Sequence, residues 1–255
     1  MAPDGRVAVV TGASSGIGEA TARALAGEGW HCVLLARRQE RLEPLATELG
    51  GEYEVCDVGD RAAVDAVARR VLERHPTVDL LVLNAGIPGR SDFLALDPER
   101  IEAVLRTNYL GSVWCARAFA PGLVAGSHVV TVVSVAGTVA FAPAGPYAAS
   151  KHAQLAFSRS LAGLLARRGV QVHTVLPGFV ETEGFPQRAV LASRFFRRAV
   201  IRPEDVAARI LRVVEKGTRE TFIPRWYRAF AIAQALAPGL VARLVARSGY
   251  RRGST

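Results

Sequence analysis

The sequence predicts an α/β fold in which a doubly wound parallel sheet carries helices on both faces. Along the 255 residues, short apolar runs alternate with stretches of helical periodicity. Several of these runs are apolar throughout, as strands buried on both faces must be. No linker, repeat or low-complexity tract interrupts the pattern before Gly217, which indicates one domain.

Seven strands are expected in chain order, the last of them a short one that closes an edge of the sheet. They cover Val7–Val10, His31–Ala36, Tyr53–Cys56, Leu80–Leu83, His128–Val133, Gln171–Leu176 and Thr221–Ile223. A period of 3.6 residues predicts helices over Arg61–Glu73 and Pro203–Glu215, and helices are also expected over Pro98–Pro121 and Tyr147–Ala166. Right-handed crossovers between parallel strands then fix most of the topology.

The composition is that of an ordinary globular protein, with 50% apolar and 22% charged residues. A net charge of +9 indicates a basic soluble surface, or else an anionic cofactor, an anionic substrate or a membrane surface. Nucleic acid is not expected as a partner, because the arginines are scattered and carry no binding motif. No metal site is expected. Three isolated cysteines and the lack of a signal-peptide pattern predict a cytoplasmic location.

A glycine-rich turn directly follows the first strand. It reads TGASSGIG over residues 11–18 and leads into a helix. Three glycines let the backbone approach a pyrophosphate closely, and the helix N-terminus adds free N–H groups and partial positive charge. The spacing is GxxxGxG, not the general dinucleotide-binding GxGxxG. The alternative is a turn that only packs the helix on the strand.

A tyrosine and a lysine lie four residues apart in a helical stretch, as Tyr147 and Lys151. This spacing puts them on one helix face, where a lysine cation would favour the phenolate and lower the pKa of the tyrosine. Ser134 ends the strand His128–Val133, and residues at that end of a parallel sheet face the ligand crevice. The alternatives are a surface Tyr/Lys pair and a serine that caps a loop.

Taken together, these motifs resemble those of the short-chain dehydrogenase/reductase family. The glycine turn, Asn84-Ala85-Gly86, Asn108, Ser134, Tyr147 with Lys151, and Pro177-Gly178 occur in the family's order and spacing over about residues 5–224. The resemblance implies a Rossmann-like sheet of about seven strands in the order 3-2-1-4-5-6-7. It also implies a catalytic domain at residues 1–224, with residues 225–255 as an apolar, basic helical extension of the same domain.

The resemblance implies four catalytic residues. Tyr147 would be the general acid for ketone reduction and the base for alcohol oxidation. Lys151 would lower the pKa of Tyr147 and bind the nicotinamide ribose. Ser134 would orient and polarise the carbonyl, and Asn108 would hold a water in a proton relay from Lys151.

The resemblance also implies a cofactor site along the carboxyl ends of the strands. Asp57 would contact the adenine ring, Pro177-Gly178 would border the nicotinamide, and Thr182 would bind the carboxamide. Besides Tyr147 and Lys151, the expected cofactor-binding residues are Gly12, Ser14, Ser15, Gly16, Ile17, Gly18, Arg37, Arg38, Asp57, Val58, Asn84, Ala85, Gly86, Pro177, Gly178, Val180 and Thr182.

The end of the second strand predicts NADP(H) as the cofactor. NAD-specific sites place an acidic residue here to hold the ribose 2′-hydroxyl, but this chain has Ala36. Arg37 follows at once and could pair with a 2′-phosphate, with Arg38 as a second cation and Ser14 as a hydroxyl contact. The alternative is that both arginines are only the solvated start of the next helix.

The leading functional hypothesis is an NADP(H)-dependent carbonyl reductase or alcohol dehydrogenase. Two alternatives remain: a reductase of 3-oxoacyl thioesters carried on acyl carrier protein or coenzyme A, and an inactive cofactor-sensing binding protein. The stretch Ile87–Arg90 departs from the usual sequence of the fatty-acid-synthesis reductases. The loop Phe179–Ile201 carries apolar residues that either receive an apolar substrate body or pack the lid on the core: Phe185, Val190, Leu191, Phe195 and Phe196.

Two further expectations concern assembly and the C-terminal segment. The apolar helices over Pro98–Pro121 and Tyr147–Ala166 match the family's twofold interface, so a homodimer or homotetramer is expected. Arg225–Tyr250 should form amphipathic helix around a break at Pro238-Gly239. This segment either lies on a membrane surface or, as we prefer, folds back over the substrate pocket or a neighbouring subunit.

Overall fold

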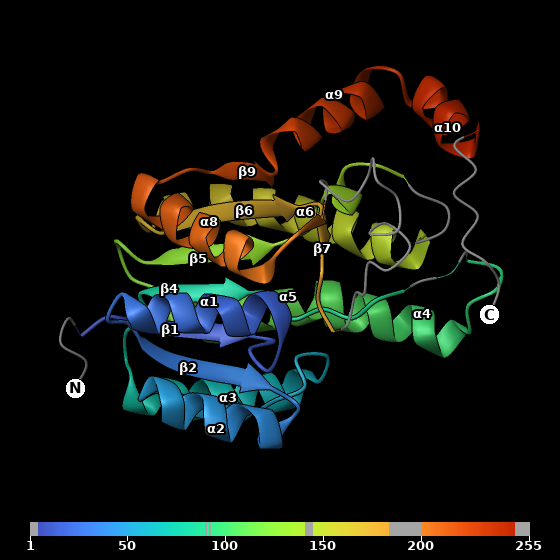
Figure 1. Ribbon diagram of the computed structural model, residues 1–255. Coiled ribbons are helices and arrows are strands. Elements are labelled where there is room, and N and C mark those ends of the chain that lie inside the picture. Colours follow the sequence, from blue (N-terminus) through green and yellow to red (C-terminus); the bar gives the residue numbers. More distant parts are fainter. Residues whose placement is uncertain (1–4, 90, 92, 141–144, 184–199, 248–255) are drawn as a thin grey trace.

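The computed structural model describes residues 5–89, 91, 93–140, 145–183 and 200–247 (Figure 1). One parallel sheet of seven strands runs through it in the order β3-β2-β1-β4-β5-β6-β9, which confirms the expected order. The strands are β1 (Val7–Thr11), β2 (His31–Ala36), β3 (Glu52–Val55), β4 (Leu80–Leu83), β5 (His128–Val132), β6 (Gln171–Pro177) and β9 (Glu220–Ile223). The last strand is numbered nine because β7 (Phe179–Val180) and β8 (Val200–Ile201) pair separately.

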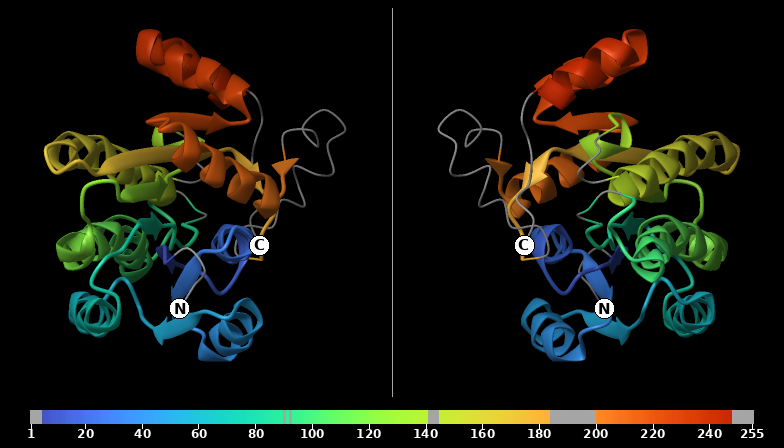
Figure 2. Two further views of the ribbon diagram at one scale, coloured as in Figure 1. Left: turned by 90° about the vertical axis from the view of Figure 1, so that its left-hand side faces the viewer. Right: turned by 90° about the vertical axis from the view of Figure 1, so that its right-hand side faces the viewer.

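Helices cover both faces of the sheet, which Figure 2 shows from two sides. One face carries α1 (Gly16–Gly27), α2 (Gln39–Leu49) and α8 (Pro203–Lys216), and the other carries α3 (Arg61–Arg74), α5 (Gly111–Phe119) and α6 (Gly145–Ala166). Since strand side chains alternate between faces, β1 contributes Val9 to one apolar core and Ala8 and Val10 to the other.

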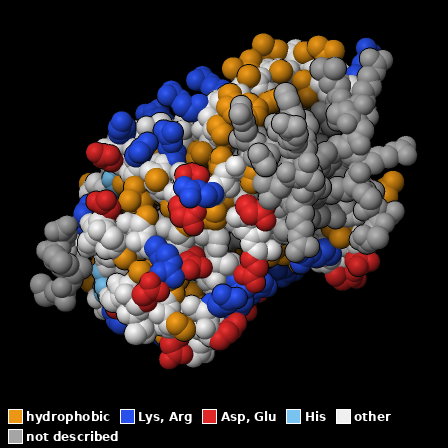
Figure 3. Space-filling model, in the orientation of Figure 1, with side chains coloured by type: hydrophobic (Ala, Val, Ile, Leu, Met, Phe, Trp, Pro, Cys, Tyr) orange, Lys and Arg blue, Asp and Glu red, His pale blue; other side chains and the backbone are white. Residues whose placement is uncertain are grey.

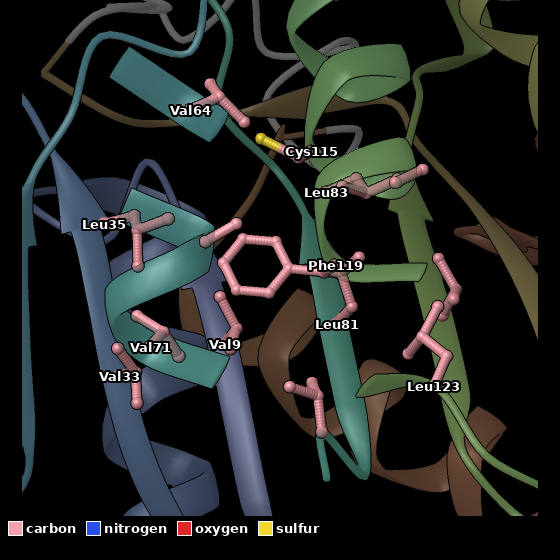
Figure 4. Packing of buried hydrophobic residues seen from close by; sticks show 14 of the residues in the cluster. Val9, Val33, Leu35, Val64, Val71, Leu81, Leu83, Cys115, Phe119 and Leu123 are labelled. Atoms are coloured by element: carbon pink, nitrogen blue, oxygen red, sulfur yellow. The ribbon is translucent and has the colours of Figure 1, made fainter. Parts of the chain in front are cut away.

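The core on the α3 and α5 side is built around Phe119, which is fully buried (Figure 4). Val71 of α3 and Val9 and Leu81 of the sheet lie around it, and Val64 of α3 lies beside Cys115 in the same cluster. The apolar residues of α3 recur at helical spacing, and Asp60 caps the helix by accepting hydrogen bonds from two backbone N–H groups. A cap of this kind contributes about 1 kcal/mol.

The helix expected over Pro98–Pro121 is wrong as one continuous element. It is divided into α4 (Pro98–Leu105), a π-helical turn (Arg106–Leu110), α5 and a 3₁₀ turn (Ala120–Gly122). The π turn adds a residue to the helical repeat and so changes the direction of the side chains after it. Asn108 lies in this turn and is fully buried.

The C-terminal segment is helical with a break, as expected, but Pro238 and Gly239 begin the second helix and the break precedes them. It forms a 3₁₀ turn (Arg225–Tyr227), α9 (Arg228–Leu236) and α10 (Pro238–Arg247), with the break at Ala237. None of the helices in the described part of the chain has the length and apolarity needed to span a bilayer. In Figure 1 the two helices lie beside the sheet edge formed by β9 and turn back over its carboxyl end.

Candidate functional site

A cavity of about 780 Å³ opens at the carboxyl ends of the strands. Most residues that the sequence places in the site line it: Gly12, Ser14, Ser15, Gly16, Ile17, Arg37, Arg38, Asp57, Val58, Asn84, Ala85, Gly86, Ser134, Tyr147, Lys151, Pro177, Gly178, Val180 and Thr182. Two of the expected site residues, Gly18 and Asn108, are not among the described residues that line the cavity. Gly18 packs on the Gly12 carbonyl, where a Cβ atom would have no room.

The glycine turn has the backbone shape and the close contacts that exclude larger residues. Gly12 and Gly16 have φ angles of +67° and +58°, a region that other residues rarely adopt. A Cβ atom on Gly12 would lie 2.8 Å from the Ala85 Cα atom, and one on Gly16 would lie 2.9 Å from the Thr182 Cγ2 atom. The Thr11 hydroxyl accepts a hydrogen bond from the Ala85 backbone N–H at 3.1 Å. The turn is therefore held against the end of β4.

Two arginines follow β2, and their environments differ. Arg38 donates hydrogen bonds to the Ser14 hydroxyl at 3.2 Å and pairs with Glu183 at 3.2 Å. The Arg37 side chain is 62% exposed, and its guanidinium forms a long ion pair with Asp57 at 3.8 Å. The Arg37 guanidinium is therefore the less constrained of the two and can meet an anion in the cavity.

Ser134, Tyr147 and Lys151 meet on one side of the cavity. The Ser134 hydroxyl donates a hydrogen bond to the Pro177 carbonyl at 3.4 Å and accepts one from the Ala136 backbone N–H at 3.1 Å. The Lys151 Nζ atom lies 5.7 Å from the centre of the Tyr147 ring. It donates hydrogen bonds to the Val132 carbonyl at 3.0 Å and to the Gln154 Oε1 atom at 2.7 Å. The lysine is thus fixed by the end of β5 and by its own helix.

Burial controls the protonation of both groups. It raises the pKa of Tyr147 to about 12, against a smaller lowering by the hydrogen bond with Ser134. Burial also lowers the pKa of Lys151 to about 7. The expected lowering of the tyrosine pKa by Lys151 is therefore not found in this structure, because removal of the phenol from water has the larger effect.

Asn108 connects to Lys151 through other side chains. Its own side chain bonds the backbone N–H and carbonyl of Ile87, at 2.7 and 3.1 Å, and the Ser150 hydroxyl at 3.0 Å. The backbone carbonyl of Asn108 accepts a hydrogen bond from the Ser112 hydroxyl, which in turn accepts one from the Gln154 side-chain amide. Because Gln154 also binds Lys151, a buried chain of hydrogen bonds joins the lysine to the Asn108 backbone.

Sequence reasoning missed Gln154, and it did not say which residues of the C-terminal segment would line the cavity. Tyr227, Phe230 and Val241 line the cavity. Tyr227 is buried and packs so closely on Gly178 that a Cβ atom there would overlap its ring. The apolar character of the segment favoured folding back over the substrate pocket or a neighbouring subunit, but it did not identify the residues that meet the cavity. The loop residues Phe185 to Phe196 named above lie outside the described residues.

Comparison with known proteins identifies the family. The sequence profile of the short chain dehydrogenases matches residues 6–189. An uncharacterized oxidoreductase of Mycobacterium tuberculosis is 47% identical over 180 residues, which cover 70% of this chain and 70% of that protein.

Two solved structures have the same fold. A single-residue variant of the actinorhodin polyketide ketoreductase, solved with NADPH, has a TM-score of 0.77 and 31% identity, over 87% of this chain and 97% of that one. A short chain dehydrogenase/reductase from Burkholderia phymatum, solved with NAD, has a TM-score of 0.81 and 27% identity, over 92% and 94%. This chain belongs to the short chain dehydrogenase family of oxidoreductases.

Proposed function

We propose that this chain is an NADP(H)-dependent enzyme that interconverts a carbonyl and a secondary alcohol, with Tyr147 as general acid and base. The observation that carries the proposal is the position of Ser134, Tyr147 and Lys151 on the same cavity as the glycine turn. A bound nicotinamide supplies or accepts the hydride. The protein supplies the proton, the orientation and the shielding from water.

The residues around the cavity suit a dinucleotide with a 2′-phosphate. The close approach of the backbone at Gly12 and Gly16 leaves room for a pyrophosphate at the start of α1. Ala36 ends β2 without a carboxylate, and the exposed guanidinium of Arg37 follows it. Since one similar structure holds NADPH and another holds NAD, the proposal of NADP(H) rests on these two residues.

Three side chains divide the proton chemistry. In reduction, Ser134 and Tyr147 donate hydrogen bonds to the carbonyl oxygen, and Tyr147 gives its phenolic proton to that oxygen as the alcohol forms. A pKa of about 12 keeps Tyr147 protonated at neutral pH, so it carries the proton that it must give, but the value lies well above the working pH at which proton transfer is most efficient. In oxidation the same phenolate takes the proton back. Lys151 stabilises it when protonated, and its pKa of about 7 leaves both the ammonium and the amine form present at neutral pH.

The proton that Tyr147 loses must be replaced from solvent. The chain from Lys151 through Gln154 and Ser112 ends on the buried backbone carbonyl of Asn108, and each donor in it points away from the lysine, so it orients Lys151 and does not deliver a proton. The relay water expected at Asn108 stays a prediction; the Asn108 side chain itself is hydrogen-bonded to Ile87 and Ser150.

The substitution Tyr147→Phe tests the proposal, because it removes the proton donor and keeps the ring. We expect NADPH-dependent turnover to fall by about 10²–10⁴-fold while NADPH binding stays nearly unchanged. The measurements are NADPH oxidation with a panel of ketones and NADPH affinity by fluorescence titration. Residual activity above about a tenth of wild type would contradict the assignment of Tyr147.

A second candidate is the reduction of 3-oxoacyl thioesters. It is favoured by the similarity to a polyketide ketoreductase and by the net charge of +9, which suits an acidic carrier. Including an acetoacetyl thioester in the same panel separates the candidates. An exclusive preference for the thioester would favour the second, and NADPH binding without turnover of any compound would favour the cofactor-sensing alternative.

The substrate class follows from the wall that the C-terminal segment forms. Tyr227, Phe230 and Val241 present aromatic and aliphatic surface to the cavity, so an apolar substrate body is proposed. This contact fits the expectation that the segment folds back over the pocket; a membrane-surface role and the domain division at residue 224 stay predictions. The homodimer or homotetramer also stays a prediction. It is supported by the apolar side chain of Leu164 on α6, which is 67% exposed in the single chain.

A further inference from the structure

Side chains of types that bind metals gather at the end of the sheet opposite the cavity. His31 is the first residue of β2, and Glu52 is the first residue of β3. His75 is the C-cap residue of α3, which packs on the same sheet. Because the strands are parallel, their amino ends lie away from the carboxyl ends that line the cavity. This cluster is therefore separate from the proposed active site.

The three side chains converge on a single point. The Nε2 atoms of His31 and His75 lie 3.2 and 2.9 Å from the same oxygen, Oε1 of Glu52. One ligand atom from each residue lies within 4.8 Å of the others. Around a tetrahedral zinc ion with bonds of about 2.0–2.1 Å, ligand atoms are roughly 3.3 Å apart. Small side-chain movements would bring the three atoms to that spacing.

The Glu52 carboxylate is held in place by Arg74 through one oxygen and faces the two imidazoles with the other. The second oxygen of Glu52, Oε2, accepts a hydrogen bond from Arg74 at 2.9 Å, which leaves Oε1 directed at the two imidazoles. Arg74 is itself tied to Glu54 at 2.9 Å. Hydrogen bonding of a ligand carboxylate by a neighbouring residue is a common feature of protein metal sites. The side chains of His31 and His75 are only 20% and 19% exposed, so their rings are restrained by packing.

We propose that His31, Glu52 and His75 bind a zinc ion. Two imidazole nitrogens and one carboxylate oxygen are a ligand set that suits Zn²⁺, whereas Mg²⁺ and Ca²⁺ prefer oxygen alone. Solvent completes the fourth position. The ion would connect the first residues of β2 and β3 to the C-terminal end of α3. The sequence did not predict this site, because its ligands come from three elements and have no recognisable spacing.

Zinc titration of the full-length, tag-free protein tests the proposal. After treatment with a chelator, calorimetric titration with Zn²⁺ is expected to show one ion per chain. His75→Ala and Glu52→Gln should each weaken binding by at least about tenfold, since each removes a ligand. His152→Ala is the matched control, because His152 is exposed on α6 and outside the cluster, and it should bind zinc like the wild type.

Thermal unfolding provides a second readout that does not depend on oxidoreductase activity. Zn²⁺ should raise the unfolding temperature of the wild type and of His152→Ala, because an ion that binds only the folded state stabilises it. The same addition should leave the two ligand variants unchanged, even if their temperatures without metal are lower. Absence of saturable Zn²⁺ binding by the wild type, or equal binding by wild type and both ligand variants, would overturn the proposal.

Discussion

The cavity has two walls of different construction. The sheet wall consists of the cavity residues at the ends of β1, β2, β4 and β5 together with those of α6, and buried strands lie directly behind it. The C-terminal wall consists of Tyr227, Phe230 and Val241, and none of the described residues of α9 is buried. Figure 3 shows apolar side chains gathered at the surface of this region. Phe230 and Leu236 of α9 are 51% and 81% exposed.

Because the two walls differ in how firmly they are supported, we expect them to have different roles in binding. The sheet wall is fixed by backbone contacts such as that between Gly12 and Ala85, so it can hold a ligand of constant shape. The C-terminal wall depends on a few aromatic contacts, with the rings of Trp226 and Tyr227 stacked at 4.1 Å. Substitution of the half-exposed Phe230 disturbs little of the core, whereas Tyr227 is buried and belongs to it. We therefore assign the cofactor to the sheet wall and substrate selection to the C-terminal wall.

The largest of the effects predicted below is on the sheet wall. Arg37→Ala should raise the Michaelis constant for NADPH by about ten- to hundredfold, since a hydrogen bond to a charged group contributes roughly 1.5–3 kcal/mol. The constant for NADH should hardly change, because NADH lacks the 2′-phosphate. Steady-state kinetics with each cofactor measure both values.

Arg38→Ala provides the matched control on the same wall. Its guanidinium is already engaged with Ser14 and Glu183, so the substitution should have the smaller effect on NADPH selectivity. An equal effect of Arg37→Ala on NADPH and NADH would contradict the 2′-phosphate role, as would a wild type that prefers NADH.

The sheet wall could be predicted from the sequence because its signals are local. The strand at His31–Ala36 agrees with β2 at both ends, since an uninterrupted apolar run reports burial on both faces. The glycine turn is likewise visible in the residue types, because Gly12 and Gly16 have positive φ angles that favour glycine. Most of the expected site residues therefore line the cavity.

The features that could not be predicted depend on partners distant in sequence. Gln154 forms hydrogen bonds with Lys151 in its own helix and with Ser112, which lies 42 residues earlier in the chain. A glutamine in a helical stretch of sequence gives no sign of such contacts. The π turn at Arg106–Leu110 has no distinctive residue pattern, and the buried hydrogen bond from Asn108 to Ser150 joins residues 42 positions apart. The C-terminal wall requires the position of Tyr227 over Gly178, which periodicity does not show.

The C-terminal wall is tested by Phe230→Ala. Phe230 lines the cavity but is half exposed, so its contact with an apolar substrate contributes about half of a full aromatic burial, or about 1 kcal/mol. The Michaelis constant for an apolar ketone should rise about fivefold, and that for NADPH should stay constant.

Trp226→Ala is the matched control for this wall. Trp226 is a neighbouring aromatic residue, 50% exposed, and it is not among the described residues that line the cavity. It should change the constant for the ketone less than Phe230→Ala does. A rise in the NADPH constant on Phe230→Ala would break the division between the two walls.

The smallest predicted effect concerns the buried lysine of the sheet wall. Burial lowers the pKa of Lys151 from 10.5 to about 7, so between these values the unfolded chain binds more protons than the folded one. The free energy of unfolding must then rise with pH in this window. The unfolding temperature of the wild type should increase by a few degrees relative to Lys151→Met between about pH 7 and about pH 8.5.

The comparison with Lys151→Met isolates this one group, because every other titrating group is common to both proteins. Lys216 is the only other lysine of the chain and is exposed at the end of α8, so Lys216→Met should keep the pH dependence of the wild type. If Lys151→Met showed the same rise with pH as the wild type, the lysine would not be held in its neutral form by burial. The sheet wall would then be wetter than its packing indicates, and its contrast with the C-terminal wall would be weaker.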